Sequence, residues 1–320
     1  MSGLWKTLKV ATKAKEADDI ASFELVDPAG EPLPRFTAGA HIDVEIAPGL
    51  VRQYSLCGAP SEQHRYLIGV LREAASRGSA TLVDTVEPGA LVRISEPRNQ
   101  FALDPSATRV VLMAGGIGIT PILCMAEHLA TTSTPFELHY CTRSRARAAF
   151  LDRISRSPFS KRTRLYFDDA PGSMPLDLSE TLKQPGPGDH LYVCGPNGFI
   201  EAVLGGAVRA GWRHEQLHKE FFTPTLGSAR ADDAFEVEVA STGTRFTVPA
   251  NRSVLDVLLA NGIEIPMSCE QGVCGTCVTG VLKGVPDHRD MFMTDEEHAR
   301  NDQFTPCCSR AKSELLVLDL

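Results

Sequence analysis

Four cysteines near the C-terminus constrain this chain more than any other feature of its sequence. Their spacing is C-x4-C-x2-C with a fourth cysteine thirty positions later: Cys269, Cys274, Cys277 and Cys307. A plant-type [2Fe–2S] cluster is held by cysteines spaced in this way. The loop must bring three thiolates together, and Gly272 and Gly275 permit the sharp turns that this requires. Spacing alone leaves open whether Cys307 or its neighbour Cys308 is the fourth ligand.

Other uses of these cysteines fit the sequence less well. A structural zinc site usually has paired C-x2-C units, and the chain contains a single such pair. A Rieske centre needs two histidines beside its cysteines, but His288 and His298 have no cysteine next to them. Five of the nine cysteines lie after residue 268, and the total is odd. We therefore expect a metal or redox site rather than a disulfide framework.

Composition excludes several classes of function. Apolar residues make up 43% of the 320 residues, which is ordinary for a globular protein. The net charge of −8 argues against a nucleic-acid partner, since such proteins usually carry a basic excess. No apolar run approaches the roughly 20 residues that cross a bilayer, and the N-terminus lacks the pattern of a secretory signal. We expect a cytoplasmic protein that does not contact a membrane.

Changes in hydrophobic pattern predict a multidomain fold. Residues 1–105 contain short alternating apolar runs, such as 41–46 and 66–71, between Pro/Gly turns, which is typical of an antiparallel β-barrel. Residues 106–225 alternate solid apolar strands with helices, which predicts a parallel α/β sheet. The expected strands are 109–114, 136–140, 164–167 and 190–194, and the expected helices are 121–129 and 198–208.

A polar, turn-prone stretch at 226–234 is typical of a linker. The remaining residues, 235–320, are expected to form an α+β domain of the β-grasp, plant-type ferredoxin kind, with strands at 235–239, 245–248 and 315–318 and a helix at 254–260. Residues 233–320 hold 14 acidic and 7 basic side chains, so nearly all of the net negative charge lies on this domain.

Two short motifs in the α/β domain predict a nucleotide site. The first runs from Gly115 to Pro121 where a strand should end and a helix begin, with Thr120 as the expected N-cap and Pro121 as the first helical residue. The second is Cys194-Gly195-Pro196 at the end of another strand. Ligands of open α/β sheets bind beyond the carboxyl ends of the strands. Alone, the first motif could be a structural turn and Cys194 a small core residue.

The barrel domain contains a candidate flavin site. Tyr54 could lie against a flat ring, Ser55 could place a hydroxyl near its reactive nitrogen, and Arg52 could meet its phosphate. A helix start at Arg77-Gly78-Ser79 could hold the same phosphate. Alone, a run of this kind is usually just a strand with a polar face. The chemistry makes a flavin necessary, because nicotinamide gives up two electrons together while an iron–sulfur cluster accepts one at a time.

These motifs, in this order over essentially the full length, resemble the phthalate dioxygenase reductase family. Segments 269–278, 287–290 and 307–312 are most similar to the reductase components of vanillate O-demethylases. The resemblance implies FMN in the barrel, NADH on the α/β domain, and a fused ferredoxin that reduces a separate Rieske non-haem iron oxygenase acting on an aromatic carboxylate. It also implies that Cys307 is the fourth cluster ligand, which leaves Cys308 as an additional thiol.

The resemblance extends to individual residues. It implies that Ser55, Cys194 and Phe222 lie at the hydride-transfer site, with Phe222 covering the flavin until nicotinamide displaces it. The other candidate cofactor-binding residues are Arg52, Tyr54, Leu56, Gly69, Arg77, Gly78, Ser79, Gly116, Thr120, Pro121, Thr142, Arg143, Gly195, Pro196 and Glu220. The basic stretch 142–147 departs from the family pattern. Because an arginine there could hold a 2′-phosphate, NADPH remains open as a donor.

Two other functions use the same cofactors. The chain could reduce free flavin, ferric chelates or oxygen without a dedicated protein acceptor, or its cluster could act as a redox sensor. Turnover with cytochrome c separates a reductase from a sensor. We also expect the acidic C-terminal domain to dock on a basic oxygenase surface, in an encounter that salt weakens.

Overall fold

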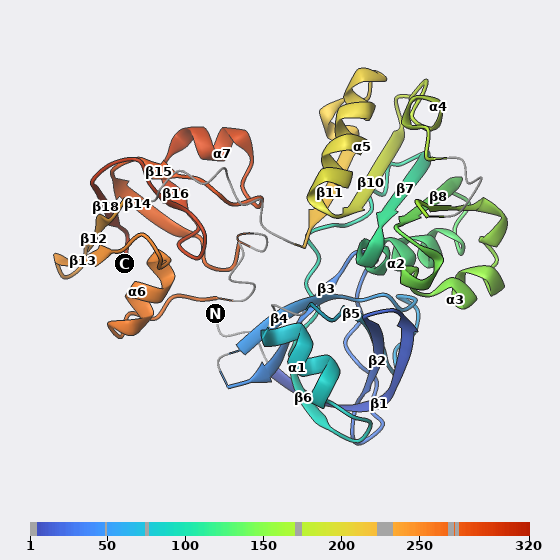
Figure 1. The fold of residues 1–320 in the computed structure, drawn as a ribbon, viewed down its shortest axis with the longest axis horizontal. Coiled ribbons are helices and arrows are strands. Elements are labelled where there is room, and N and C mark those ends of the chain that lie inside the picture. The colour runs from blue at the N-terminus through green and yellow to red at the C-terminus, as the bar shows by residue number, and fades with distance from the viewer. Residues whose placement is uncertain are drawn as a thin grey trace. The chain divides into compact units, whose positions relative to one another are not determined.

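The structure is a computed structural model, and it describes residues 5–48, 50–73, 77–169, 175–222, 233–267, 272 and 275–320. The chain divides into two compact units, Met1–Glu220 and Phe221–Leu320. Figure 1 shows a barrel-like sheet and a second, helix-flanked sheet in the first unit and a smaller sheet in the second. Most of the expected linker, residues 226–232, lies outside the described residues.

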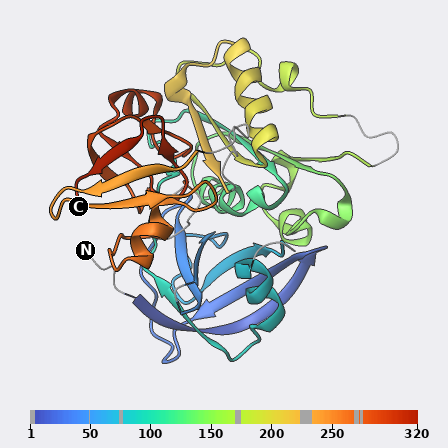
Figure 2. The same cartoon turned by 60° about the vertical axis from the view of Figure 1, so that its left-hand side comes forward.

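The first sheet contains six antiparallel strands in the order β4-β3-β6-β1-β2-β5. The strands are β1 (Trp5–Ala17), β2 (Ile20–Val26), β3 (His41–Ala47), β4 (Leu50–Ser55), β5 (Tyr66–Leu71) and β6 (Leu91–Ser95). Strand β1 is the long curved dark-blue strand in Figure 2. A bridge between Leu56 and Ile68 joins the end of β4 to β5, so the sheet closes on itself as a barrel.

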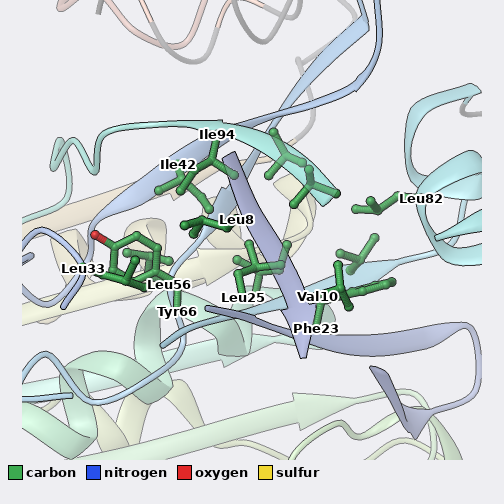
Figure 3. Packing of buried hydrophobic residues seen from close by; sticks show 14 of the residues in the cluster. Leu8, Val10, Phe23, Leu25, Leu33, Ile42, Leu56, Tyr66, Leu82 and Ile94 are labelled. Carbon is green, nitrogen blue, oxygen red and sulfur yellow. The ribbon is translucent and has the colours of Figure 1, made fainter. Parts of the chain in front are cut away.

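Alternating side chains of these strands fill the barrel. Figure 3 shows Leu8, Phe23, Ile42, Leu56 and Tyr66 packed together with their neighbours in its interior. Helix α1 (Arg77–Thr85) packs against β3, β4 and β5. The alternation of apolar and polar residues is therefore a consequence of strands that have one face in the core and one in solvent.

The second sheet has the order β11-β10-β7-β8-β9, and the pairs β10–β7, β7–β8 and β8–β9 are parallel. Its strands are β7 (Arg109–Gly115), β8 (Phe136–Thr142), β9 (Thr163–Phe167), β10 (Asp189–Gly195) and β11 (Leu217–Phe221). The helices are α2 (Ile119–Leu129), α3 (Leu151–Arg156), α4 (Leu178–Thr181) and α5 (Asn197–Arg209), with 3-10 turns η1 (Gly116–Gly118), η2 (Arg145–Arg147), η3 (Ser160–Arg162) and η4 (His214–Gln216). From β7 the chain continues to β8 and β9 on one side of the sheet and then returns to β10 on the other side of β7. The point between β7 and β10 is therefore the topological switch point, where such sheets bind ligands.

The C-terminal unit is a five-stranded mixed sheet in the order β13-β12-β18-β14-β16, with a separate β15–β17 pair. Its strands are β12 (Phe235–Val239), β13 (Thr244–Val248), β14 (Thr279–Lys283), β15 (Pro286–Asp287), β16 (Gln303–Phe304), β17 (Arg310–Ala311) and β18 (Leu315–Leu318), and its helices are α6 (Val254–Ala260) and α7 (Asp295–Arg300). A buried core of valine, leucine and phenylalanine lies between the sheet and α6.

The predicted multidomain fold class is confirmed. Each expected strand and helix is present, with ends that differ by at most two residues. The sequence analysis did not identify the β1–β2 hairpin, strands β6, β11 and β14 to β17, or the short helices α3, α4 and α7; most of these elements are too short to show a clear hydrophobic period. Among the described residues, no helix combines the length and the apolar character needed to cross a bilayer.

Candidate functional site

The two glycine motifs lie side by side at the switch point of the parallel sheet. Strands β7 and β10 are in register with Ala114 opposite Cys194, so both motifs leave the sheet at the same edge. A Cβ on Gly118 would lie 2.3 Å from the carbonyl oxygen of Cys194, and a Cβ on Gly195 would lie 2.9 Å from the Cα of Gly115. This contact between the two backbones is possible only with glycine.

The first glycine of the turn that follows β7, Gly116, has a left-handed backbone and open space beside it. Gly116 has a φ of +54°, and a Cβ at this position would contact no atom within 4 Å. Its backbone therefore faces open space at the start of η1, directly before helix α2. Backbone amides at such a helix entrance attract a phosphate.

The expected capping at this turn is wrong. Helix α2 begins at Ile119 with Gly118 as its N-cap, so Thr120 is its second residue and Pro121 its third. The Thr120 hydroxyl donates to the carbonyl of Ile117 at 3.0 Å and does not cap a helix amide. The glycines let the chain enter the helix earlier than expected. Pro121 is still tolerated because first-turn amides have no helical partner.

Two polar side chains meet where the barrel joins the parallel sheet, and a buried thiol lies within the electrostatic influence of one of them. The Ser55 hydroxyl, at the end of β4, donates to a carboxyl oxygen of Glu220 on β11 at 3.4 Å. Burial raises the pKa of Glu220 to about 8. Burial also raises the pKa of the fully buried Cys194 thiol, and the nearby Glu220 carboxyl raises it further. At neutral pH both groups are therefore protonated and uncharged.

The candidate flavin residues surround the start of α1. A Cβ on Gly78 would lie 2.8 Å from the Cγ of Arg52, so the guanidinium stem runs directly beneath the first turn of this helix. The Tyr54 hydroxyl is buried and has no hydrogen-bond partner among the described residues, and burial raises its pKa. Both observations fit a flavin phosphate at the helix start and a ring carrying polar atoms beside Tyr54.

The remaining barrel candidates differ in how they could reach a flavin. Ser79 is buried, and its hydroxyl accepts a hydrogen bond from the amide of Glu73 at 3.1 Å. Leu56 is completely buried in the barrel core. Gly69 on β5 is packed against the parallel-sheet half, since a Cβ there would lie 2.7 Å from the Thr120 methyl. Arg77 is the first residue of α1.

Two candidate nucleotide-binding residues, Thr142 and Arg143, lie at the end of β8, where the ribose of the nucleotide is expected. The Thr142 side chain is buried and donates to the Ser144 carbonyl at 2.9 Å, while the Arg143 side chain is exposed. The amides of Asp168 and Asp169 donate to the carbonyls of Thr142 and Arg143 at 3.2 and 3.1 Å. Two acidic residues therefore flank the basic stretch, a feature that the sequence pattern did not reveal.

Pro196 precedes α5 as its N-cap residue and has no side-chain role there. Phe222 directly follows β11 and is half-buried. Its place over the flavin stays a prediction.

The described cysteines of the C-terminal unit form one close pair. The sulfurs of Cys277 and Cys307 lie 3.3 Å apart. The Cys308 thiol interacts with that of Cys307, lies 3.2 Å from the Thr305 hydroxyl and would be 2.3 Å from a Cβ on Gly272. Cys269 and Cys274 lie outside the described residues. Two soft thiolates this close suit iron or another soft metal.

A second polar group supports the cysteine loop, and the sequence reasoning missed it. The buried Asp290 carboxylate accepts hydrogen bonds from the Met293 amide at 2.8 Å and from the His298 ring at 3.2 Å. His288 stacks on His298 with ring centroids 4.4 Å apart. These three side chains have ligand atoms within 4.8 Å of one another.

Comparison with known proteins identifies the parts of the chain. A family model described as a 2Fe-2S iron-sulfur cluster binding domain matches residues 237–312. Another, described as the N-terminal domain of the dimethylamine monooxygenase subunit DmmA-like family, matches residues 94–217. The C-terminal unit is therefore a [2Fe–2S] domain, as its cysteine spacing predicts.

Full-length relatives are also similar to this chain. A vanillate O-demethylase oxidoreductase from Pseudomonas putida is 54% identical over 313 residues, which is 97% of this chain and 98% of the relative. A phthalate dioxygenase reductase from Burkholderia cepacia is 41% identical and covers 98% of this chain and 97% of its own length. A solved phthalate dioxygenase reductase, described as a modular structure for electron transfer from pyridine nucleotides to [2Fe–2S], has a TM-score of 0.80 at 40% identity, over 99% of this chain and 98% of its own.

Proposed function

The chain belongs to the phthalate dioxygenase reductase family, and on that premise we propose that it takes electron pairs from NADH and delivers single electrons to an oxygenase component. We further propose that this oxygenase is a Rieske non-haem iron enzyme. Flavin-reductase and redox-sensor roles are not favoured, because the relatives are reductase components. A bound FMN supplies the conversion from paired to single electrons.

The observation that carries this proposal is the hydrogen bond between Ser55 and Glu220, whose charge also acts on the Cys194 thiol. It joins the barrel strand that carries the flavin candidates to the two strands at the nucleotide edge of the parallel sheet. The Ser55 hydroxyl is oriented by Glu220, which is protonated below a pH of about 8 and so places no negative charge at the site. The neutral Cys194 thiol forms an apolar, water-excluding wall. These residues orient the reactants and exclude water.

FMN would bind at the N-terminus of helix α1. Arg52 and the first-turn amides at Gly78 and Ser79 would hold its phosphate, with Tyr54 against the ring. NADH would bind across Gly116–Thr120 and Cys194–Pro196. We propose NADH over NADPH because Asp168 and Asp169 lie beside Arg143 and would repel a 2′-phosphate.

Cys269, Cys274, Cys277 and Cys307 would bind the cluster, and the 3.3 Å sulfur separation favours Cys307 over Cys308. We keep residues 1–105, 106–225 and 235–320 as the proposed domains and the cytoplasm as the proposed location. The acidic excess of residues 233–320 supports docking on a basic oxygenase surface.

The test is the visible spectrum of the purified protein with flavin extraction and an iron assay, before and after NADH. We expect flavin and iron–sulfur bands that bleach with NADH and respond far less to NADPH. Electron delivery to a Rieske oxygenase should slow as salt rises, while NADH-driven flavin reduction in the same samples should not. A colourless folded protein, or zinc in place of iron, would overturn the proposal.

A further inference from the structure

One buried aromatic residue is held in an unfavourable backbone conformation beside the proposed site. Phe150 has φ +60° and ψ +20°, in the left-handed region, and is 2% exposed. The other described non-glycine residues with positive φ are Asp19, Gln184 and Asn301, polar residues of types that accept this region more readily. A bulky residue in this conformation persists only where its surroundings impose it.

Two hydrogen bonds impose the conformation. The amide of Ala149 donates to the buried Tyr140 hydroxyl on β8 at 3.0 Å. The carbonyl of Phe150 accepts from the Ile154 amide at 2.9 Å, which starts α3. The backbone is therefore fixed on both sides of the residue, and the direction of its ring is determined.

The ring tip reaches the place where the barrel meets the parallel sheet. A Cβ on Gly69 of β5 would lie 3.1 Å from the Cζ of Phe150 and 2.7 Å from the methyl group of Thr120. The Thr120 methyl group and the Phe150 ring thus both lie against Gly69, with no room for an added methyl group there. Dense packing of this kind transmits a displacement rather than absorbing it.

The segment that carries Phe150 also binds the barrel a second time. The amide of Asp18, in the turn between β1 and β2, donates to the carbonyl of Ala146 at 2.8 Å. The segment begins with the proposed ribose residues Thr142 and Arg143 and ends at Phe150. It therefore connects the nucleotide edge of the sheet to the barrel.

We infer that Phe150 is a positioning residue for hydride transfer: its ring sets the separation between strand β5 of the barrel and the start of helix α2 at Thr120, and thereby the distance between flavin and nicotinamide. This inference rests on the proposed function. Phe150 touches neither reactant in this account. Its strained backbone is the consequence of placing the ring in the contact between the two halves.

The test compares three variants of the full-length holoenzyme by stopped-flow flavin reduction. Phe150→Leu shortens the side chain, Phe150→Gly also relieves the backbone strain, and Gly69→Ala widens the same contact from the barrel side. Phe159→Leu is the matched control, because Phe159 is equally buried but packs on Phe136 instead. FMN content and thermal unfolding are measured for every variant.

The three variants should lower the limiting rate of flavin reduction about ten-fold or more, since sub-ångström misplacement is costly in hydride transfer. The primary isotope effect with deuterated NADH should change, while the NADH dissociation constant stays within about two-fold. Phe159→Leu should alter unfolding but neither kinetic quantity. Limiting rates and isotope effects equal to wild type, in Phe150→Gly or Gly69→Ala with full FMN, would overturn the inference. Absence of NADH-driven flavin reduction in the wild type would instead refute the proposed function.

Discussion

Replacing Glu220 with glutamine should remove a pH-dependent loss of stability from the first unit. The carboxyl has a pKa of about 8 in the folded chain against 4.5 in the unfolded chain, because burial disfavours its charge. Because the pKa is raised on folding, the contribution of the protonated carboxyl to the free energy of unfolding is fully present below pH 4.5. It is lost as the pH rises through the folded-state pKa of about 8. Over the whole range the loss is about 5 kcal/mol, and between pH 6.5 and 8 it is about 2 kcal/mol.

The window above pH 6.5 separates Glu220 from the buried histidines. Burial lowers the pKa of His41 and of His218 to about 4, so both favour the folded state increasingly from pH 4 to 6.5, and this slope fades within about one pH unit above 6.5. Between pH 6.5 and 8 the wild type should lose stability while Glu220→Gln should not, because the small histidine slope that remains is positive and is the same in both proteins. The variant should gain about 2 kcal/mol relative to wild type across this window.

Urea unfolding followed by tryptophan fluorescence measures this difference. Both tryptophans, Trp5 and Trp212, lie in residues 1–220, so the signal reports the unit that contains Glu220. Glu201→Gln, an exposed position on α5, is the control and should follow the wild type. A wild type whose stability is constant from pH 6.5 to 8, or a Glu220→Gln variant with the same slope as wild type, would refute the reasoning.

Three further predictions follow from close backbone and sulfur contacts. Gly118→Ala should lower the free energy of unfolding in urea by about 3 kcal/mol or more, because its Cβ would clash with the carbonyl of Cys194. The control Gly198→Ala, which has open space around it, should change the same free energy by less than about 1 kcal/mol. Gly78→Ala should weaken FMN binding about ten-fold because the added methyl group would displace Arg52, as measured by flavin retained on dialysis; unchanged retention would contradict the phosphate site. Cys307→Ala should lose its iron while Cys308→Ala keeps it, as an iron assay on each variant decides.

The sequence by itself determined the order of the parts and most of their secondary structure. Strand alternation in residues 41–71 and solid apolar strands after residue 109 follow from which faces are buried, and burial is a local property of the pattern. The cysteine spacing predicted the cluster domain because a metal cluster tolerates few loop geometries.

Only the tertiary structure decided which residues meet. Ser55 and Glu220 are 165 positions apart, and Gly69 lies on barrel strand β5 whereas Phe150 precedes α3, so no spacing could pair them. The start of α2 at Ile119 likewise depended on the packing of Gly118 against Cys194, not on the capping preference of Thr120. Charge states, close contacts and strain depend on neighbours that are remote in sequence, and folding alone brings them together.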